Sequence, residues 1–150
     1  MNQIIKKEIL NLPSKRCINV HCAPLPRYGG MSPYVWILAH QEKHSAATIH
    51  YMDEGLDTGD IISQEFEPVV EKDSAFALFY RCCLRAAAML LEVTDAIESE
   101  RVASHTQDLS QKSYFSWPTR ECIRDLRNHG YRLAKFSDIV MAIVQQKPRV

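Results

Sequence analysis

The sequence predicts a mixed α/β fold, because strand-like and helix-like segments alternate in the order α-β-α-β-β-α. Three segments are rich in apolar and β-branched residues, as strands are: Cys17–Cys22, Ala46–Met52 and Ile61–Val69. Apolar residues recur at helical spacing between Asp73 and Glu100, which indicates a long amphipathic helix. A length of 150 residues fits about one domain with its own core.

The first half of the chain is expected to hold two short helices beside the strands. Residues 3–10 have the apolar pattern of a short amphipathic helix. The stretch Ala23–Pro33 contains three prolines and a Gly-Gly pair, so regular structure should stop there. Ser32 suits the N-cap of a helix over residues 33–41, with a proline at its first position. Residues 53–59 are expected to form a turn-rich loop with two glycines.

The long helix should begin at Asp73 or Ser74, since both residue types cap helices well. Its core-facing side is predicted from the helical spacing of its larger apolar residues, namely Phe76, Phe79, Tyr80, Cys83, Ala87, Leu90 and Ile97. The opposite side carries Arg81, Arg85, Glu92 and Asp95. These charges also exclude a membrane-spanning helix in this stretch.

The last third of the chain is expected to be helical and basic. Thr119 can cap a helix that Gly130 ends, and Ser137 or Asp138 can open a last helix to about Gln146. Residues 101–150 carry nine basic and four acidic side chains, with aromatic residues between them. Such a stretch can contact phosphates, but a solvated helix face above core aromatics is the preferred interpretation.

Composition excludes several classes of protein. Eighteen basic and eighteen acidic residues cancel, so no overall field attracts nucleic acid or an anionic membrane. The first ten residues lack the features of a secretory signal, which favours a cytoplasmic location. The cysteine count is five, and no C-x-x-C spacing occurs. Reduced core cysteines are therefore expected rather than a disulfide framework or a structural zinc site.

Three polar residues form a candidate catalytic group. Asn19 and His21 are two apart on a predicted strand, so their side chains project from the same face. An amide can donate to a developing oxyanion, and an imidazolium can do so while acting as a general acid. Asp57 lies in the glycine-flanked loop and could orient His21 and stabilise its charged form. On spacing alone, a structural Asn–His pair and an ordinary turn explain these residues better. The other histidines show no metal-site grouping.

Three blocks in order make the identification more specific. They are Ile18-Asn19-Val20-His21, then Pro24-Leu25-Pro26-Arg27-Tyr28-Gly29-Gly30, then residues 48–62 with the sequence TIHYMDEGLDTGDII. Together they resemble the folate-dependent formyltransferase family, which includes glycinamide ribonucleotide, methionyl-tRNA and sugar-amine N-formyltransferases. The resemblance covers residues 8–70 strongly and the following helix loosely.

The resemblance implies a partial Rossmann-like formyltransferase fold, with strands in a mixed sheet and flanking helices. Residues 1–100 would form the C-terminal half of the catalytic domain, lacking most of the N-terminal half. Residues 101–150 would form a helical extension on the same domain. The implied reaction is formyl transfer from 10-formyltetrahydrofolate to a primary amine, without a metal. Asn19, His21 and Asp57 match the family's catalytic residues. The folate pterin pocket would be lined by Met52, Asp53, Glu54, Gly55 and Leu56.

Departures from the family pattern bear on the acceptor. Ala23-Pro24-Leu25-Pro26 replaces the common S-L-L-P, and Gly29 and Ala46 stand where a basic residue and a glycine are usual. The A-P-L-P form is similar to the branch that acts on sugar amines, carrier-bound amino acids or other small amines, so a nucleic-acid partner is not expected. One alternative is a truncated, catalytically impaired structural or regulatory partner. Another is a methionyl-tRNA formyltransferase-like fragment. Exposed strand edges would favour a homodimer or pairing with a partner chain.

Overall fold

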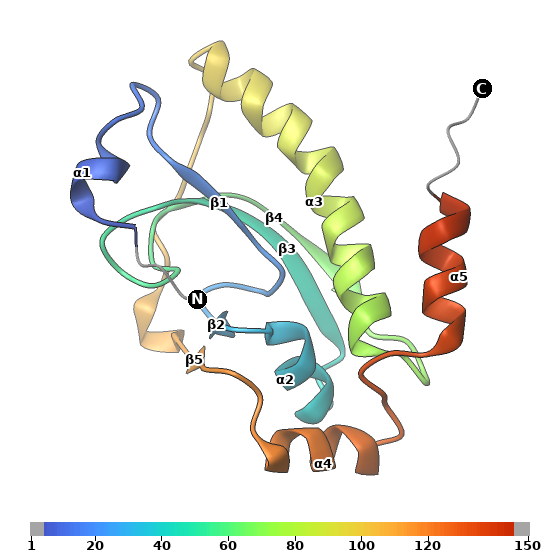
Figure 1. Ribbon diagram of the computed structural model, residues 1–150. Helices are drawn as coiled ribbons and strands as arrows, with labels where there is room; N and C mark the ends of the chain where they lie inside the picture. The colour runs from blue at the N-terminus through green and yellow to red at the C-terminus, as the bar shows by residue number, and fades with distance from the viewer. Residues whose placement is uncertain (1–4, 146–150) are drawn as a thin grey trace.

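The computed structural model describes residues 5–145, in which helices and strands alternate as the sequence predicts (Figure 1). The α/β class is therefore confirmed. In chain order the elements are α1 (Lys7–Leu10), β1 (Ile18–His21), β2 (Gly29–Gly30), α2 (Pro33–Ala39), β3 (His44–Tyr51), β4 (Ile61–Pro68), α3 (Ala75–Glu98), a 3₁₀ turn (Leu109–Gln111), β5 (Tyr114–Phe115), α4 (Arg120–Asn128) and α5 (Phe136–Gln145). Of the predicted first helix, residues 3 and 4 lie outside the described residues.

The main sheet has the strand order β1-β3-β4, and both pairings are antiparallel. Parallel pairing also occurs, but in a separate two-stranded sheet of β2 and β5. Because side chains alternate along a strand, β3 presents Ala47 and Ile49 to one face and Thr48 and His50 to the other. The β1 residue Asn19 is the register partner of His50. The polar side chains of β1 and β3 therefore lie on the same face of the sheet.

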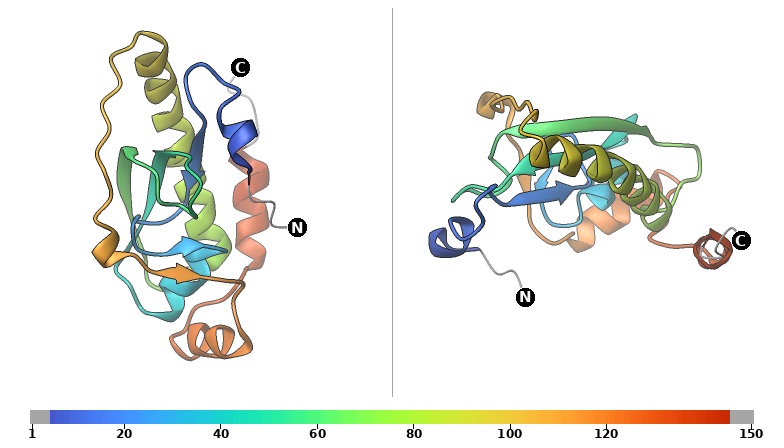
Figure 2. Two further views of the ribbon diagram at one scale, coloured as in Figure 1. Left: turned by 90° about the vertical axis from the view of Figure 1, so that its left-hand side faces the viewer. Right: turned by 90° about the horizontal axis from the view of Figure 1, so that it is seen from above.

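Helix α3 runs along the apolar face of this sheet (Figure 2), and its buried stripe differs from the predicted one. The buried residues are Ala75, Leu78, Cys82, Ala86, Met89 and Val93. The predicted core residues Phe76, Phe79 and Ala87 are exposed, and Tyr80, Cys83, Leu90 and Ile97 are only half-buried. The sequence prediction is therefore wrong for Phe76, Phe79 and Ala87, whereas Cys83, Leu90 and Ile97 pack against the core as predicted.

The rotation of α3 has a physical cause in its two arginines. Arg81 Nε donates to Glu67 Oε1 at 2.8 Å, and its Nη2 donates to Asp73 Oδ2 at 2.7 Å. Arg85 Nε donates to Glu67 Oε2 at 2.9 Å. Glu67 and Asp73 are buried, and buried carboxylates need such partners. Holding both guanidinium groups over β4 turns the smaller apolar residues, rather than the aromatic ones, toward the sheet.

A leucine pair within α3 tests this rotation. Leu78 is fully buried, whereas Leu91 is 75% exposed. We expect Leu78→Ala to lower the free energy of unfolding by about 3 kcal/mol, because it leaves a cavity in the core. Leu91→Ala is the matched control and should leave stability nearly unchanged. Urea unfolding of both variants measures the difference, and equal losses would contradict the observed rotation.

Side-chain caps confirm most of the predicted helix boundaries. Ser74 accepts from Ala77 N at the start of α3, and Thr119 accepts from Cys122 N at the start of α4. Gly130 follows α4 with φ +84°. Ser32 precedes α2, but it has φ 50° and makes no side-chain cap. Helix α5 begins at Phe136, one or two residues before the predicted start, because Asp138 accepts from Lys135 N at 2.6 Å.

The C-terminal third contacts the rest of the chain at several places. His105 pairs with Ile61 beside β4, β5 pairs with β2, and Arg132 bridges to Ser74. A second core cluster lies among α2, α3 and α4, with Leu38, Leu78 and Leu126 fully buried. The division of the chain at residue 100 stays a prediction.

The thiols follow the expected pattern of core cysteines. All five cysteines are free, and three of them are buried. Burial raises the pKa of Cys82 and of Cys122 to about 11, so both remain protonated thiols at neutral pH.

Within residues 5–145, no helix is long and apolar enough to cross a membrane.

Candidate active site

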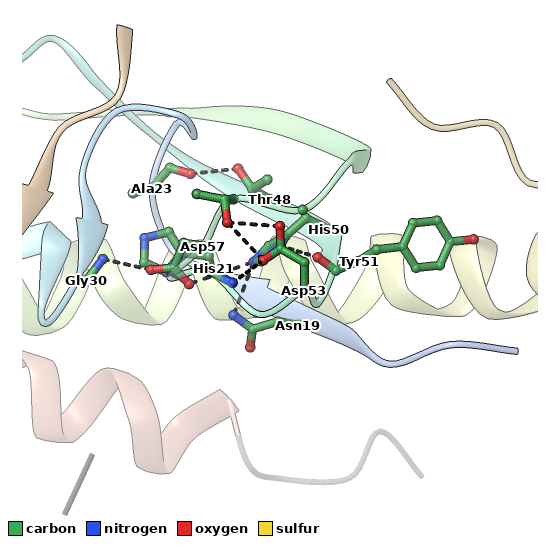
Figure 3. A network of polar contacts seen from close by, with 12 residues as sticks. Asn19, His21, Ala23, Gly30, Thr48, His50, Tyr51, Asp53 and Asp57 are labelled. Atoms are coloured by element: carbon green, nitrogen blue, oxygen red, sulfur yellow. Dashed lines mark hydrogen bonds and ion pairs between the residues drawn. The ribbon is translucent and has the colours of Figure 1, made fainter. Parts of the chain in front are cut away.

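Asn19, His21 and His50 lie together on the polar face of β1 and β3 (Figure 3). Asn19 Nδ2 lies 3.2 Å from His50 Nε2. Antiparallel pairing explains this contact, because directly opposite residues have side chains on the same face. Asn19 and His21 thus share one face, as predicted, and His50 is a third polar residue on that face.

Hydrogen bonds to backbone carbonyls assign the tautomers of both histidines. His50 Nδ1 lies 2.8 Å from Tyr51 O, and His21 Nε2 lies 2.9 Å from Tyr28 O. A carbonyl oxygen only accepts, so each of these ring nitrogens carries a proton. In neutral His50 the remaining nitrogen, Nε2, accepts from the Asn19 amide. In His21 the remaining nitrogen, Nδ1, faces Asp57.

The Asp57 carboxylate lies between the two histidines. Its Oδ1 is 3.9 Å from His21 Nδ1 and 3.9 Å from His50 Nε2. Its Oδ2 accepts from Gly30 N at 2.8 Å. Both distances exceed that of a direct hydrogen bond, so a water molecule or a substrate group would have to join the carboxylate to either imidazole. The three sequence-predicted residues Asn19, His21 and Asp57 are therefore brought together.

Two glycines allow the Asp57 loop to reach the strand. A side chain at Gly59 would overlap the carbonyl oxygen of Tyr51, so only glycine permits this close approach. Gly30 has φ +100°, and a side chain there would overlap the carbonyl oxygen of Phe115. Asp57 itself has φ 55°, an uncommon conformation for a residue other than glycine.

His50 is the site residue that sequence reasoning missed. The sequence gives it no role beyond that of the other histidines, because nothing in the sequence gives the register between β1 and β3. The one available signal was period-two alternation, which puts His50 on the same face as Thr48. Burial lowers the pKa of His50, and Asp57 opposes this effect only in part. The imidazole is therefore neutral at pH 7 and can accept from Asn19.

The lowered pKa predicts how stability depends on pH. Below the unfolded-state pKa of about 6.5, the unfolded chain binds a proton at His50 that the folded chain does not. Stability from this residue is therefore present above pH 6.5 and is lost as the pH falls toward the folded-state pKa. Urea unfolding between pH 5 and 8 should show a smaller acid loss in His50→Asn than in the wild type. The exposed-histidine control His129→Asn should retain the wild-type slope, and an equal slope in His50→Asn would contradict the assignment.

The predicted pterin loop lies directly before Asp57. Asp53 Oδ1 accepts from Gly55 N at 3.0 Å and from Thr58 Oγ1 at 2.8 Å, which closes the loop on itself. Glu54 pairs with Lys7 at 2.7 Å, and Leu56 is 42% exposed. An exposed apolar side chain beside polar backbone suits a flat heterocycle with ring nitrogens. The assignment of residues 52–56 to a folate pocket stays a prediction.

The described residues contain no group of three or more His, Cys, Asp or Glu side chains arranged to hold a metal ion.

A family model described as "Formyl transferase" matches residues 1–94. This chain belongs to that formyltransferase family. It is similar to the methionyl-tRNA formyltransferase of Syntrophus aciditrophicus, with 41% identity over 112 residues, which is 75% of this chain and 36% of the relative. The Clostridioides difficile enzyme of that name is 38% identical over 97% of this chain and 52% of its own length. The chain thus spans between about a third and a half of these relatives' lengths.

Solved formyltransferase structures share the fold. A sugar 3N-formyltransferase, WlaRD, determined with dTDP and 5-N-formyl-THF, has a TM-score of 0.73 and 26% identity, covering 83% of this chain and 51% of its own. PseJ from Anoxybacillus kamchatkensis, in complex with a UDP-formamido sugar and tetrahydrofolate, has a TM-score of 0.69 and 28% identity. The match covers 77% of this chain and 60% of PseJ.

Proposed function

We propose that this chain transfers a formyl group from 10-formyltetrahydrofolate to a primary amine of a small substrate, such as an amino sugar or an amino acid. The observation that carries the proposal is the convergence of Asn19, His21 and Asp57 on one face of the sheet. Membership of the formyltransferase family supports the reaction type. Reduced folates in the solved relatives support the donor.

The proposed chemistry begins when the amine nitrogen attacks the formyl carbon. A carbon–nitrogen bond forms, and the formyl oxygen becomes an oxyanion. The Asn19 amide has two N–H groups, of which one is given to His50, so the other is free to donate to this oxygen. Protonated His21 would add a second donor. Such preorganised donors stabilise an oxyanion strongly when water is excluded.

Asp57 is proposed to transfer the proton from the attacking amine toward the folate. The attacking amine becomes positively charged and must lose a proton. The oxyanion then returns to a carbonyl, the bond between the formyl carbon and N10 breaks, and N10 of the leaving tetrahydrofolate gains a proton. A carboxylate that faces two imidazoles, each 3.9 Å away, is placed to accept the first proton and pass it on through water. Residues 52–56 would hold the pterin beside this carboxylate, with Leu56 against the ring.

The acceptor has a second candidate, the amino group of methionyl-tRNA. The observation that favours it is the 41% and 38% identity to methionyl-tRNA formyltransferases, which exceeds the identity to the sugar enzymes. The zero net charge and the A-P-L-P sequence favour the small amine instead. Incubation with 10-formyltetrahydrofolate and a panel of amino sugars, amino acids and methionyl-tRNA separates the two.

The assay measures both tetrahydrofolate release and the mass of the formylated product. We expect product with a small amine and none with methionyl-tRNA; the reverse result would establish the second candidate. No product with any acceptor would support a catalytically impaired structural or regulatory partner. Sedimentation velocity with the same preparation tests the proposed homodimer, and a stable monomer would remove it.

A further inference from the structure

Gln107 joins the segment after α3 to the loop that carries Asp57. It lies outside residues 1–94, which the family model matches. Figure 2 shows this segment running back along the molecule from the end of α3 toward β5. The Gln107 side chain is 6% exposed. Its Nε2 donates to Asp57 O at 3.1 Å and to Gly59 O at 2.7 Å. One amide group therefore ties together the two sides of the turn.

Asp57 needs such support because of its backbone conformation. Its φ of 55° lies in the left-handed region, which a residue with a side chain adopts only when the surrounding structure holds it there. Two contacts supply this restraint. Gly30 N holds the carboxylate at 2.8 Å, and Gln107 holds the carbonyl oxygen of the same residue. Loss of either contact would let the carboxylate swing away from the histidines.

The segment after α3 also fixes the position of Gly30 N, which binds the Asp57 carboxylate. Gly29 N donates to Ser113 O at 2.9 Å, and Met31 N donates to Phe115 O at 2.8 Å. Tyr28 N donates to the hydroxyl of Ser113 at 2.9 Å. These bonds place Gly30 N, which in turn binds the Asp57 carboxylate. Gln107, Ser113 and Phe115 thus restrain Asp57 from both directions.

The side-chain oxygen of Gln107 makes this arrangement costly. Among residues 5–145, it is the one buried side-chain polar atom without a hydrogen-bond partner. A buried acceptor left without a partner is destabilising, and an apolar side chain of the same size would avoid that cost. Methionine is of similar size but has no donor, so it would leave the carbonyl oxygens of Asp57 and Gly59 without this partner. The amide is explained by its two donated hydrogen bonds.

We propose that Gln107 is a positioning residue that sets the Asp57 carboxylate between His21 and His50. The catalytic part of this inference rests on the proposed formyl transfer, whereas the positioning itself can be observed without any substrate. Gln107 does not touch the reacting atoms and acts through Asp57.

The test compares Gln107→Met with Gln111→Met in the full chain labelled with ¹⁵N-histidine. Gln111 lies on the same segment but makes an exposed hydrogen bond to Asp108. Movement of the carboxylate should shift the His21 Nδ1 and His50 Nε2 resonances in Gln107→Met and leave both unchanged in Gln111→Met. In the transfer assay, Gln107→Met should lower kcat by about 10²-fold, as a misplacement of about 1 Å can, with KM for the amine unchanged. Gln111→Met should match the wild type.

Thermal unfolding of each variant separates positioning from simple loss of fold. Gln107→Leu is a second variant that cannot donate to the two carbonyls and adds no charge, and it should show the same histidine shifts. Wild-type resonances in a folded Gln107 variant would overturn the proposal, as would wild-type kcat. Histidine shifts in a protein that transfers no formyl group would leave the positioning intact and refute the proposed function instead.

Discussion

Replacing Asp57 with alanine is expected to lower kcat for formyl transfer by about 10³-fold, because proton transfer loses its carboxylate. The Asp57 Oδ1 atom lies 3.9 Å from both imidazoles, so its removal disconnects His21 and His50 from the proton path. The fold should survive. The lost bond from Gly30 N to Oδ2 is a single hydrogen bond, worth about 1 kcal/mol.

The measurement is single-turnover release of tetrahydrofolate, with Asp60→Ala as the matched control from the same loop. Asp60 contributes its backbone oxygen to Tyr51 N, an interaction that alanine retains. Asp60→Ala should therefore keep nearly full activity. Wild-type turnover in folded Asp57→Ala would contradict the proposed proton path.

Asn19→Ala is expected to lower kcat by about 10²- to 10³-fold, as removal of one oxyanion donor does. One N–H of its amide is held by His50 and the other is free for the oxyanion. Folate affinity should change little, because residues 52–56 do not include this donor. The expected signature is a fall in kcat at constant folate KM.

Asn128→Ala is the control, since Asn128 lies on the exposed end of α4. His21→Ala should reduce kcat in the same manner as Asn19→Ala, because it removes the second donor. A raised KM with an unchanged kcat in Asn19→Ala would mean that Asn19 binds substrate without stabilising the transition state.

Local chemistry predicted much of the scaffold. Strand periodicity placed Asn19 and His21 on one face, and the glycines around Asp57 predicted a loop that could return to the strand. The Ser74 and Thr119 caps are local too, since a hydroxyl needs only the backbone three residues on. Features of this kind depend on neighbours in sequence, so spacing alone predicts them. The catalytic assignment of Asn19, His21 and Asp57 depends instead on the family resemblance.

The missed features all depend on contacts between distant segments. His50 joins the site only through the register of β3 with β1. The rotation of α3 depends on ion pairs from Arg81 and Arg85 to carboxylates on β4 and its following loop. Gln107 reaches Asp57 across a sequence separation of 50 residues. No periodicity within one segment carries such information, because it belongs to the pairing of segments.

The central claim is that residues 52–57 bind a reduced folate beside the Asn19–His21 pair. Isothermal titration of the full chain with 5-formyltetrahydrofolate tests it most directly, since this stable folate cannot donate its formyl group in the assay. We expect saturable binding of one folate per chain, weakened by Leu56→Asp, which places a charge on the exposed apolar side of the loop. Absence of binding to a folded wild-type chain, or equal binding by Leu56→Asp, would contradict it.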